Sequence, residues 1–132
     1  MDTGNVTTPT DSRQAWGAVL GGLHSAVDAA ALIGEDVEVL SQAADAGRVI
    51  VLRDSGGRDL YPGFQFRGGW PPAALIAAYR TIAEVADPWT AASWSASPDP
   101  LLGGQSPAES VIDGNGDLVL QLASRDAARL AA

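Results

Sequence analysis

The side chains able to do acid–base, nucleophilic or metal chemistry are few and scattered in this chain of 132 residues. His24 is the single histidine, it lies in a segment of small residues, and the chain has no cysteine. Without a neighbouring nucleophile or second ligand, His24 is interpreted as a surface or packed residue. No GxxxxGK[ST] or GxGxxG phosphate loop and no GxSxG elbow is present. The sequence therefore predicts a protein that is not an enzyme and binds neither a metal nor a cofactor.

Charge gives the next constraint. The chain carries 8 basic and 16 acidic residues, a formal net charge of −8, and every basic residue is an arginine. Such a balance opposes nucleic-acid binding by the isolated chain, because that affinity comes largely from neutralising phosphates. It favours instead a partner of complementary charge.

One stretch is locally basic. It holds the candidate nucleic-acid contacts Arg48, Arg53 and Arg58, with Arg67 beside them. A basic hairpin of this kind can contact phosphates as a wing does. The alternative is an ordinary solvated strand surface, neutralised by the neighbouring acids Asp45, Asp54 and Asp59. The sequence leaves both interpretations open.

Half of the aromatic residues, Trp70, Tyr79, Trp89 and Trp94, lie within one stretch of 25 residues. Such rings fill the core of a small helical bundle, and tryptophan and tyrosine are also the side chains that anchor protein interfaces. The sequence does not decide which ring does which.

These residues must be positioned by a mainly α-helical fold. Apolar spacing predicts a helix over 15–34, in which the pair Gly21 and Gly22 either breaks the helix or admits another one closely. Residues 35–47 predict a second helix, and 49–66 a β-hairpin around a turn at 54–57. Pro62 makes the return strand an edge or ends it. A helix followed by such a hairpin resembles the end of a winged helix-turn-helix.

The rest of the chain is predicted to be helical. Caps are expected at Asp87, followed by a proline, at Ser106, whose Glu109 completes a capping box, and at Asp117 before a last helix. The fold class is thus a small helical bundle with one β-hairpin and a winged-helix-like N-terminal part. Its expected divisions are a disordered tail at 1–14, a degenerate helix-turn-helix and wing-like region at 15–66, and a helical domain at 67–132.

No apolar run approaches the roughly 18 residues that a membrane span requires. The first residues lack the basic and then apolar pattern of a secretory signal. We therefore expect a cytoplasmic protein without a membrane partner.

A family resemblance is carried by four segments in order: YPGFQF at 61–66, DPWTAASW at 87–94, SPDPLLGGQSPAESV at 97–111 and GDLVLQLA at 116–123. Together they resemble the toxin-binding domain of the Xre/MbcA/ParS antitoxins, over roughly residues 60–125. In that family a tryptophan closes one helix, a Leu-Gly-x-x-Pro corner follows, and a Gly-Asp or similar pair opens a final helix. The matching positions here are Trp94, Leu102, Gly103, Pro107 and Asp117, with one extra residue in the corner.

The resemblance implies an antitoxin of a type II toxin–antitoxin system, whose partner is a RES-domain toxin that consumes NAD. In the family the C-terminal helix and tail cover the entrance of the toxin's active site. The resemblance therefore implies a toxin-binding face made by Trp94, Leu118, Val119, Leu122, Arg125, Arg129, Leu130, Ala131 and Ala132. Arginine suits a pocket that accepts a pyrophosphate, but Arg125 and Arg129 can equally complement the C-terminal end of their helix.

The alternative function is a DNA-binding transcriptional regulator that uses the helix and hairpin of residues 35–66. The segment before residue 60 is short for a complete Xre-type DNA-binding domain. A homodimer and operator DNA, bound mainly by the toxin complex, stay open as further partners.

Overall fold

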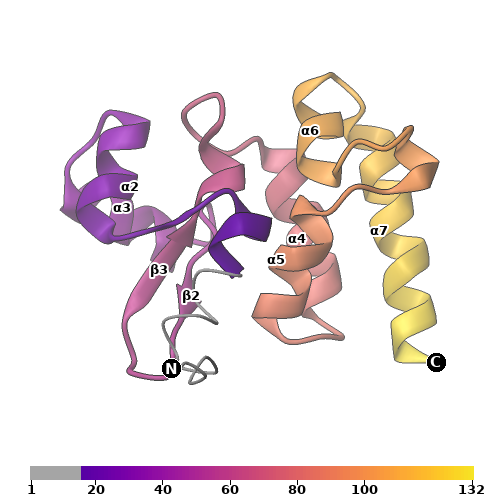
Figure 1. Cartoon of the computed structure of the whole chain (residues 1–132), viewed down its shortest axis with the longest axis horizontal. Coiled ribbons are helices and arrows are strands. Elements are labelled where there is room, and N and C mark those ends of the chain that lie inside the picture. The colour runs from indigo at the N-terminus through magenta and orange to yellow at the C-terminus, as the bar shows by residue number, and fades with distance from the viewer. Residues whose placement is uncertain (1–15) are drawn as a thin grey trace, which may run out of the picture.

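The computed structural model describes residues 16–132 and is mainly helical, with a small antiparallel sheet (Figure 1). The tail predicted at 1–14 lies outside the described residues. After a helical turn at 16–20, the elements follow in the order β1 (Leu23–His24), α2 (Ala26–Ile33), α3 (Val37–Asp45), β2 (Leu52–Arg53), β3 (Asp59–Pro62), η2 (Gly63–Phe66), α4 (Ala73–Ala83), α5 (Pro88–Ala96), η3 (Pro100–Leu102), α6 (Pro107–Ile112) and α7 (Gly116–Ala131). The predicted fold class is confirmed.

The helix predicted over 15–34 is interrupted. Gly21 and Gly22 adopt φ values of 75° and 97°, which glycine reaches without the steric penalty of a side chain. The next two residues form β1 instead of continuing the helix, and Ser25 then caps α2 by accepting a hydrogen bond from the backbone N–H of Asp28 at 3.2 Å. Of the two roles left open for the glycine pair, breaking the helix is the one observed.

Helices α2 and α3 form a helix-turn-helix. Gly34 ends α2 at a φ of 72°, and the carboxylate of Asp36 caps α3 by accepting from the N–H of Val39 at 2.9 Å. Their inner faces, with those of β3 and η2, bury a small core of Ala29, Ala30, Ile33, Leu40, Ala43, Val49, Tyr61 and Phe66.

The sheet has the order β1-β3-β2, with both pairs antiparallel. Leu52 pairs with Leu60 in the hairpin, and Leu23 pairs with Pro62 on the other side. The return strand is therefore central and not an edge, and it tolerates Pro62 because it ends there. Residues 63–66, expected to continue the strand, form the 3₁₀ helix η2. A helical turn, β1, α2, α3 and the hairpin together make the winged-helix-like part.

The main core crosses the predicted boundary at residue 66. Helix α4 packs against α5 and along α7, and their buried side chains join those of the N-terminal part. Trp16 and Trp89 meet edge to face at 5.2 Å, and the Trp89 indole donates to the Arg53 carbonyl at 3.2 Å. The main core includes Leu20, Leu52 and Phe64 from one side and Leu75, Ile82, Ala91 and Val119 from the other. No helix between residues 16 and 132 has the length and apolar character needed to cross a membrane.

Candidate functional site

A tightly fixed corner joins α5 to α6. The Asp99 carboxylate accepts from the backbone N–H of Leu101 at 2.8 Å, and the Asp99 N–H donates to the Gln105 carbonyl at 2.9 Å. Gly103 and Gly104 have φ values of 66° and 88°, so the chain reverses where other residues would be strained. The corner presents Leu101 outward, with 57% of its surface exposed.

The predicted capping box of α6 is confirmed. The backbone N–H of Glu109 donates to the Ser106 hydroxyl at 3.1 Å, and the N–H of Ser106 donates to the Glu109 carboxylate at 2.9 Å. Arg67 lies 3.2 Å from the same carboxylate. These contacts hold the pKa of Glu109 below its ordinary value, the hydrogen bond from the Ser106 backbone being the largest cause and Arg67 the next.

Helix α7 starts slightly earlier than predicted. Its N-cap is Asn115, whose side chain makes no cap hydrogen bond, and Asp117 lies within the first turn instead of capping it. The N–H of Asn115 donates to the Ser110 carbonyl at 2.8 Å and ties the helix start to α6. A Cβ on Gly116 would lie 3.1 Å from the Ala74 side chain, so a residue as small as glycine suits this approach of α7 to α4.

The two sides of α7 differ in exposure. Val119 and Leu122, predicted to contact a toxin, are 0% and 6% exposed and belong to the main core. Their burial against α4 does not favour the toxin contact predicted for them, most of all for Val119, whereas Leu122 also lines a small hollow beside Leu101 and Leu118. Leu118 and Leu130 are 48% and 53% exposed. The outward residues among those predicted are Leu118, Arg125, Arg129, Leu130, Ala131 and Ala132.

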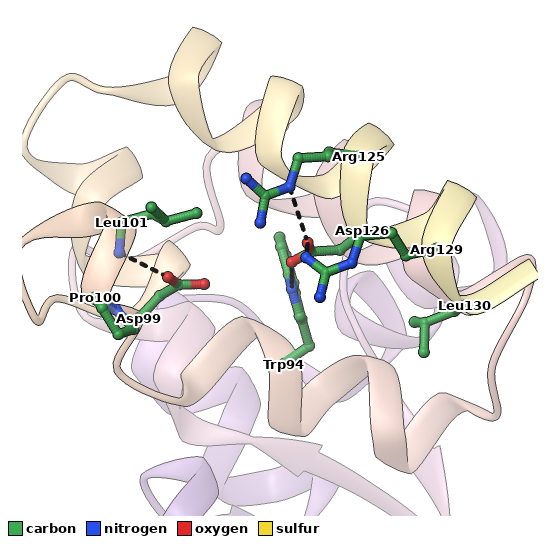
Figure 2. Close-up of a pocket in the computed structure, with 8 residues that line it drawn as sticks. All are labelled: Trp94, Asp99, Pro100, Leu101, Arg125, Asp126, Arg129 and Leu130. Carbon is green, nitrogen blue, oxygen red and sulfur yellow. Dashed lines mark hydrogen bonds and ion pairs between the residues drawn. The ribbon is translucent and has the colours of Figure 1, made fainter.

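The open side of α7 borders a groove of about 750 Å³ (Figure 2). The last two turns of the helix form one wall, and Trp94 of α5 with the corner residues Asp99, Pro100 and Leu101 form the other. A second hollow of about 300 Å³ shares Leu101 and Arg125 with it and reaches Leu118. The two hollows therefore adjoin each other, and together we call them the α7 groove.

Asp126 organises the charges in the α7 groove. Its carboxylate accepts a hydrogen bond from the Trp94 indole at 2.9 Å. Arg125 and Arg129 approach the same carboxylate at 3.7 and 3.6 Å, too far for hydrogen bonds, so these are ion pairs only. Figure 2 shows the Arg129 guanidinium beside Asp126 above Trp94, whereas Arg125 faces Asp126 with its Nε and the rest of its guanidinium points away. Sequence reasoning found Trp94 and the arginines but missed Asp126, whose only signal is its place between two arginines of one helix.

The hairpin arginines are held more closely. Arg53 donates twice to Asp59, at 3.0 and 3.2 Å, and the Arg58 guanidinium lies 3.2 Å from Asp54. Arg48 lies over the Trp70 ring at 5.9 Å. Two of the three acids expected to neutralise this region therefore do so. The backbone N–H of Arg58 donates to Asp54 and is the largest cause that lowers the pKa of that carboxyl.

His24 packs against glycine backbone. Its ring is half-buried, and a Cβ on Gly63 would lie 2.8 Å from the His24 Nε2 atom. Across residues 16–132, no group of three or more histidine and acidic side chains is placed to hold a metal ion.

Comparisons of this chain with protein-family models, with curated proteins and with solved structures gave no match. The antitoxin resemblance therefore rests on the sequence motifs alone, and the site rests on its own geometry.

Proposed function

We propose that this chain is an antitoxin that binds and neutralises a RES-domain, NAD-consuming toxin through the open side of α7. The observation that carries the proposal is the division of this helix. Val119, Leu122 and Ala123 anchor it in the core, while its last two turns and the α7 groove stay accessible. A helix fixed on one side loses little conformational freedom when its other side binds, which favours affinity.

The corner before α7 supports the same role. The capping box, the turn at Gly103 and Gly104 and the bond from Asn115 to α6 each limit the direction in which α7 can leave the bundle. The C-terminal end of α7 lies at the far edge of the molecule from α2 and α3 (Figure 1). It can therefore reach into the entrance of a partner's cavity without the N-terminal part colliding with that partner.

In this proposal the arginines of α7 lie at the entrance of the toxin's active site. Arg125 and Arg129 have side chains 53% and 69% exposed, on the same side of the helix as Leu130. A guanidinium binds a carboxylate through two parallel hydrogen bonds, so each arginine can pair with an acidic side chain at that entrance. The terminal Ala131 and Ala132 are exposed and small enough to enter with them.

The test is co-expression of the full chain with a RES-domain toxin encoded beside its gene, with growth and cellular NAD as readouts. The unchanged chain is expected to restore both, and a chain that ends at residue 123 is expected to lose protection. This truncation keeps the buried anchors Val119 and Leu122. Full protection by the truncated chain would contradict the proposal.

A second variant separates binding from folding. Arg125→Glu with Arg129→Glu leaves the core unchanged and reverses two charges on the open side of α7. We expect loss of protection with an unchanged circular dichroism spectrum. Arg53→Glu on the hairpin is the matched control, because Arg53 is equally exposed and lies outside the α7 groove.

The alternative, a DNA-binding regulator, is supported by the helix-turn-helix and hairpin arrangement of α2 to β3. The charges on these helices oppose it. Residues 26–47 contain the acids Asp28, Glu35, Asp36, Glu38 and Asp45 and no arginine. Operator binding that falls steeply with salt and is lost in Arg53→Ala plus Arg58→Ala would support this function. An unchanged gel shift in that double variant would count against it.

A further inference from the structure

The α7 groove has spare hydrogen-bond donors. Each guanidinium carries five N–H donors, yet in the described part of the chain the only carboxylate paired with Arg125 or Arg129 is that of Asp126, beyond 3.5 Å. The groove's carboxylates, by contrast, each hold a short hydrogen bond: Asp126 accepts from Trp94 at 2.9 Å and Asp99 from Leu101 at 2.8 Å. The donors left over at this site face solvent and are available to an incoming acceptor, and a carboxylate is the acceptor that guanidinium binds most strongly among protein groups.

The same groove is also apolar. Leu101, Leu118 and Leu130 are about half exposed, at 57%, 48% and 53%, and Trp94 lies half-buried between the first and the last. At a helical rise of about 1.5 Å per residue, the groove runs about 18 Å along α7 from Leu118 to Leu130. This length matches an extended segment of five or six residues.

We infer that the α7 groove binds a short segment of the partner protein that carries an apolar side chain and a carboxylate. The apolar side chain packs against Leu101 and Trp94, and the carboxylate bridges Arg125 and Arg129. The inference rests on the proposed function for the identity of the partner, and it deepens that function by naming the chemistry of the partner's contact. The chain as a whole is acidic, at −8, whereas the groove is lined by two arginines and two aspartates, so an acidic segment meets less repulsion here than over most of the surface.

The first experiment is a nuclear magnetic resonance titration of the full chain labelled with nitrogen-15. The probe is a capped hexapeptide of alternating leucine and glutamate, compared with the same peptide carrying lysine in place of glutamate. The resonances to follow are the Trp94 indole N–H and the Nε–H groups of Arg125 and Arg129. We expect these to shift with the glutamate peptide and to stay in place with the lysine peptide.

Several results would overturn the inference. Equal shifts with the lysine peptide, shifts confined to other residues, or no shift up to about 5 mM peptide each contradict it, since useful segment binding lies at or below about 1 mM. Resonance shifts of the same size with inorganic phosphate would mean that the groove binds small anions and does not recognise a peptide segment. Self-association through these residues, detected by sedimentation at rising concentration, would mean that a second copy occupies the groove.

Three variants test the charge argument, because they are expected to strengthen, weaken or leave unchanged the affinity for the glutamate peptide. Asp126→Asn keeps an oxygen that accepts from Trp94 but removes the internal competitor for both guanidinium groups. It is expected to tighten binding of the glutamate peptide about two- to fivefold, the range of an exposed ion pair. Arg125→Gln with Arg129→Gln is expected to weaken it at least tenfold, and the control Arg53→Gln to leave it unchanged. Weaker binding in Asp126→Asn would overturn the inference.

The two proposals fail differently. If the truncated chain loses protection against the toxin while the peptide does not bind, the groove chemistry is wrong and the proposed function stands. If the glutamate peptide binds as expected while the full chain gives no protection, the groove is correct and the partner is not a RES-domain toxin.

Discussion

Arg53 on the hairpin and Arg129 on α7 have almost equally exposed side chains, at 72% and 69%. Arg53 donates two hydrogen bonds to a carboxylate of its own, at 3.0 and 3.2 Å, whereas Arg129 shares Asp126 with Arg125 and with the Trp94 indole. Exposure and charge therefore do not identify a binding arginine by themselves. The supply of carboxylates around it is a further criterion, and by this criterion Arg125 and Arg129 have more unused donors than Arg53.

The two regions also differ in how their backbone is fixed. In the N-terminal part the buried amide of Gln65 spans two segments, donating to the Ile50 and Pro62 carbonyls at 2.8 and 3.1 Å and accepting from the Ile50 N–H at 2.7 Å. In the C-terminal part, local caps such as the Ser106 and Glu109 pair fix the corner. Each region also has a bond between distant residues, Gln65 with Ile50 in the first and Trp94 with Asp126 in the second, so the reciprocal local cap is what distinguishes the corner.

The contrast between the two regions is tested most strongly at α7, because the proposed function requires that this helix have one packed side and one open side. Leu122→Ala is expected to lower the free energy of unfolding by about 3 kcal/mol, since it opens a cavity in the core. Leu118→Ala, one turn earlier and 48% exposed, is expected to change it by less than about 0.5 kcal/mol. Urea unfolding of both variants measures the difference. Equal losses would mean that α7 has no open side.

Gln65→Leu tests the anchor of the N-terminal part. The change keeps the side-chain volume and leaves the Ile50 N–H and two carbonyls without their partner, so we expect a loss of about 2 kcal/mol in unfolding free energy. Gln121→Leu, the same change at an exposed position of α7, is the control. If both variants unfold at the same urea concentration, the amide bridge does not hold the hairpin.

The parts that were predictable from the sequence are the local ones. The caps at Asp87 and Ser106 were identified correctly because a cap and the backbone N–H that it accepts from lie three residues apart. The break at Gly21 was among the expected outcomes because glycine reaches positive φ. A cap can still be displaced, and at α7 the chain favours Asn115 over Asp117.

The parts that were not predictable depend on long-range contacts. Helix α7 has apolar residues around more than one side in its first half, so its pattern alone does not tell the core side from the open side. Its burial is decided by α4, which is distant in the sequence. The bond between Trp94 and Asp126 joins residues 32 positions apart, and the two-residue strand β1 is too short to leave a periodic signal.

Caps in the two regions give a smaller test. Ser106→Ala is expected to lower the unfolding free energy by about 1 kcal/mol, because it breaks one half of a reciprocal box. Ser25→Ala in the N-terminal part removes a single hydrogen bond of 3.2 Å and is expected to lower it by about 0.5 kcal/mol. Thermal unfolding of both variants, read at one pH, compares them. If Ser25→Ala lowers the unfolding free energy more than Ser106→Ala does, local caps do not stabilise the corner more strongly than the N-terminal part.

The smallest effect concerns pH, and it again compares the corner with the hairpin. The pKa of Glu109 is lowered, first by the Ser106 backbone N–H and then by Arg67, and the pKa of Asp54 is lowered mainly by the backbone N–H of Arg58. A carboxyl whose pKa is lower in the folded than in the unfolded chain adds stability above its unfolded pKa, and this stability is lost as the pH falls through the folded pKa. Both groups therefore destabilise the fold on acidification.

The variant Glu109→Gln separates the contribution of Glu109 to acid sensitivity from that of Asp54. The glutamine keeps an oxygen for the Ser106 N–H but does not titrate, so the unfolding midpoint of this variant should fall less steeply with pH below about 5 than that of the unchanged chain. Asp54→Asn should flatten the same curve independently, because the Glu109 carboxyl is stabilised by Ser106 and Arg67, whereas the Asp54 carboxyl is stabilised by Arg58 and Gly56 in the hairpin. Additive flattening in the double variant indicates two separate acid-sensitive anchors. If the curve of unfolding midpoint against pH is no flatter in the double variant than in either single variant, the corner and the hairpin respond to acid as one unit. The core that the two regions share would connect them.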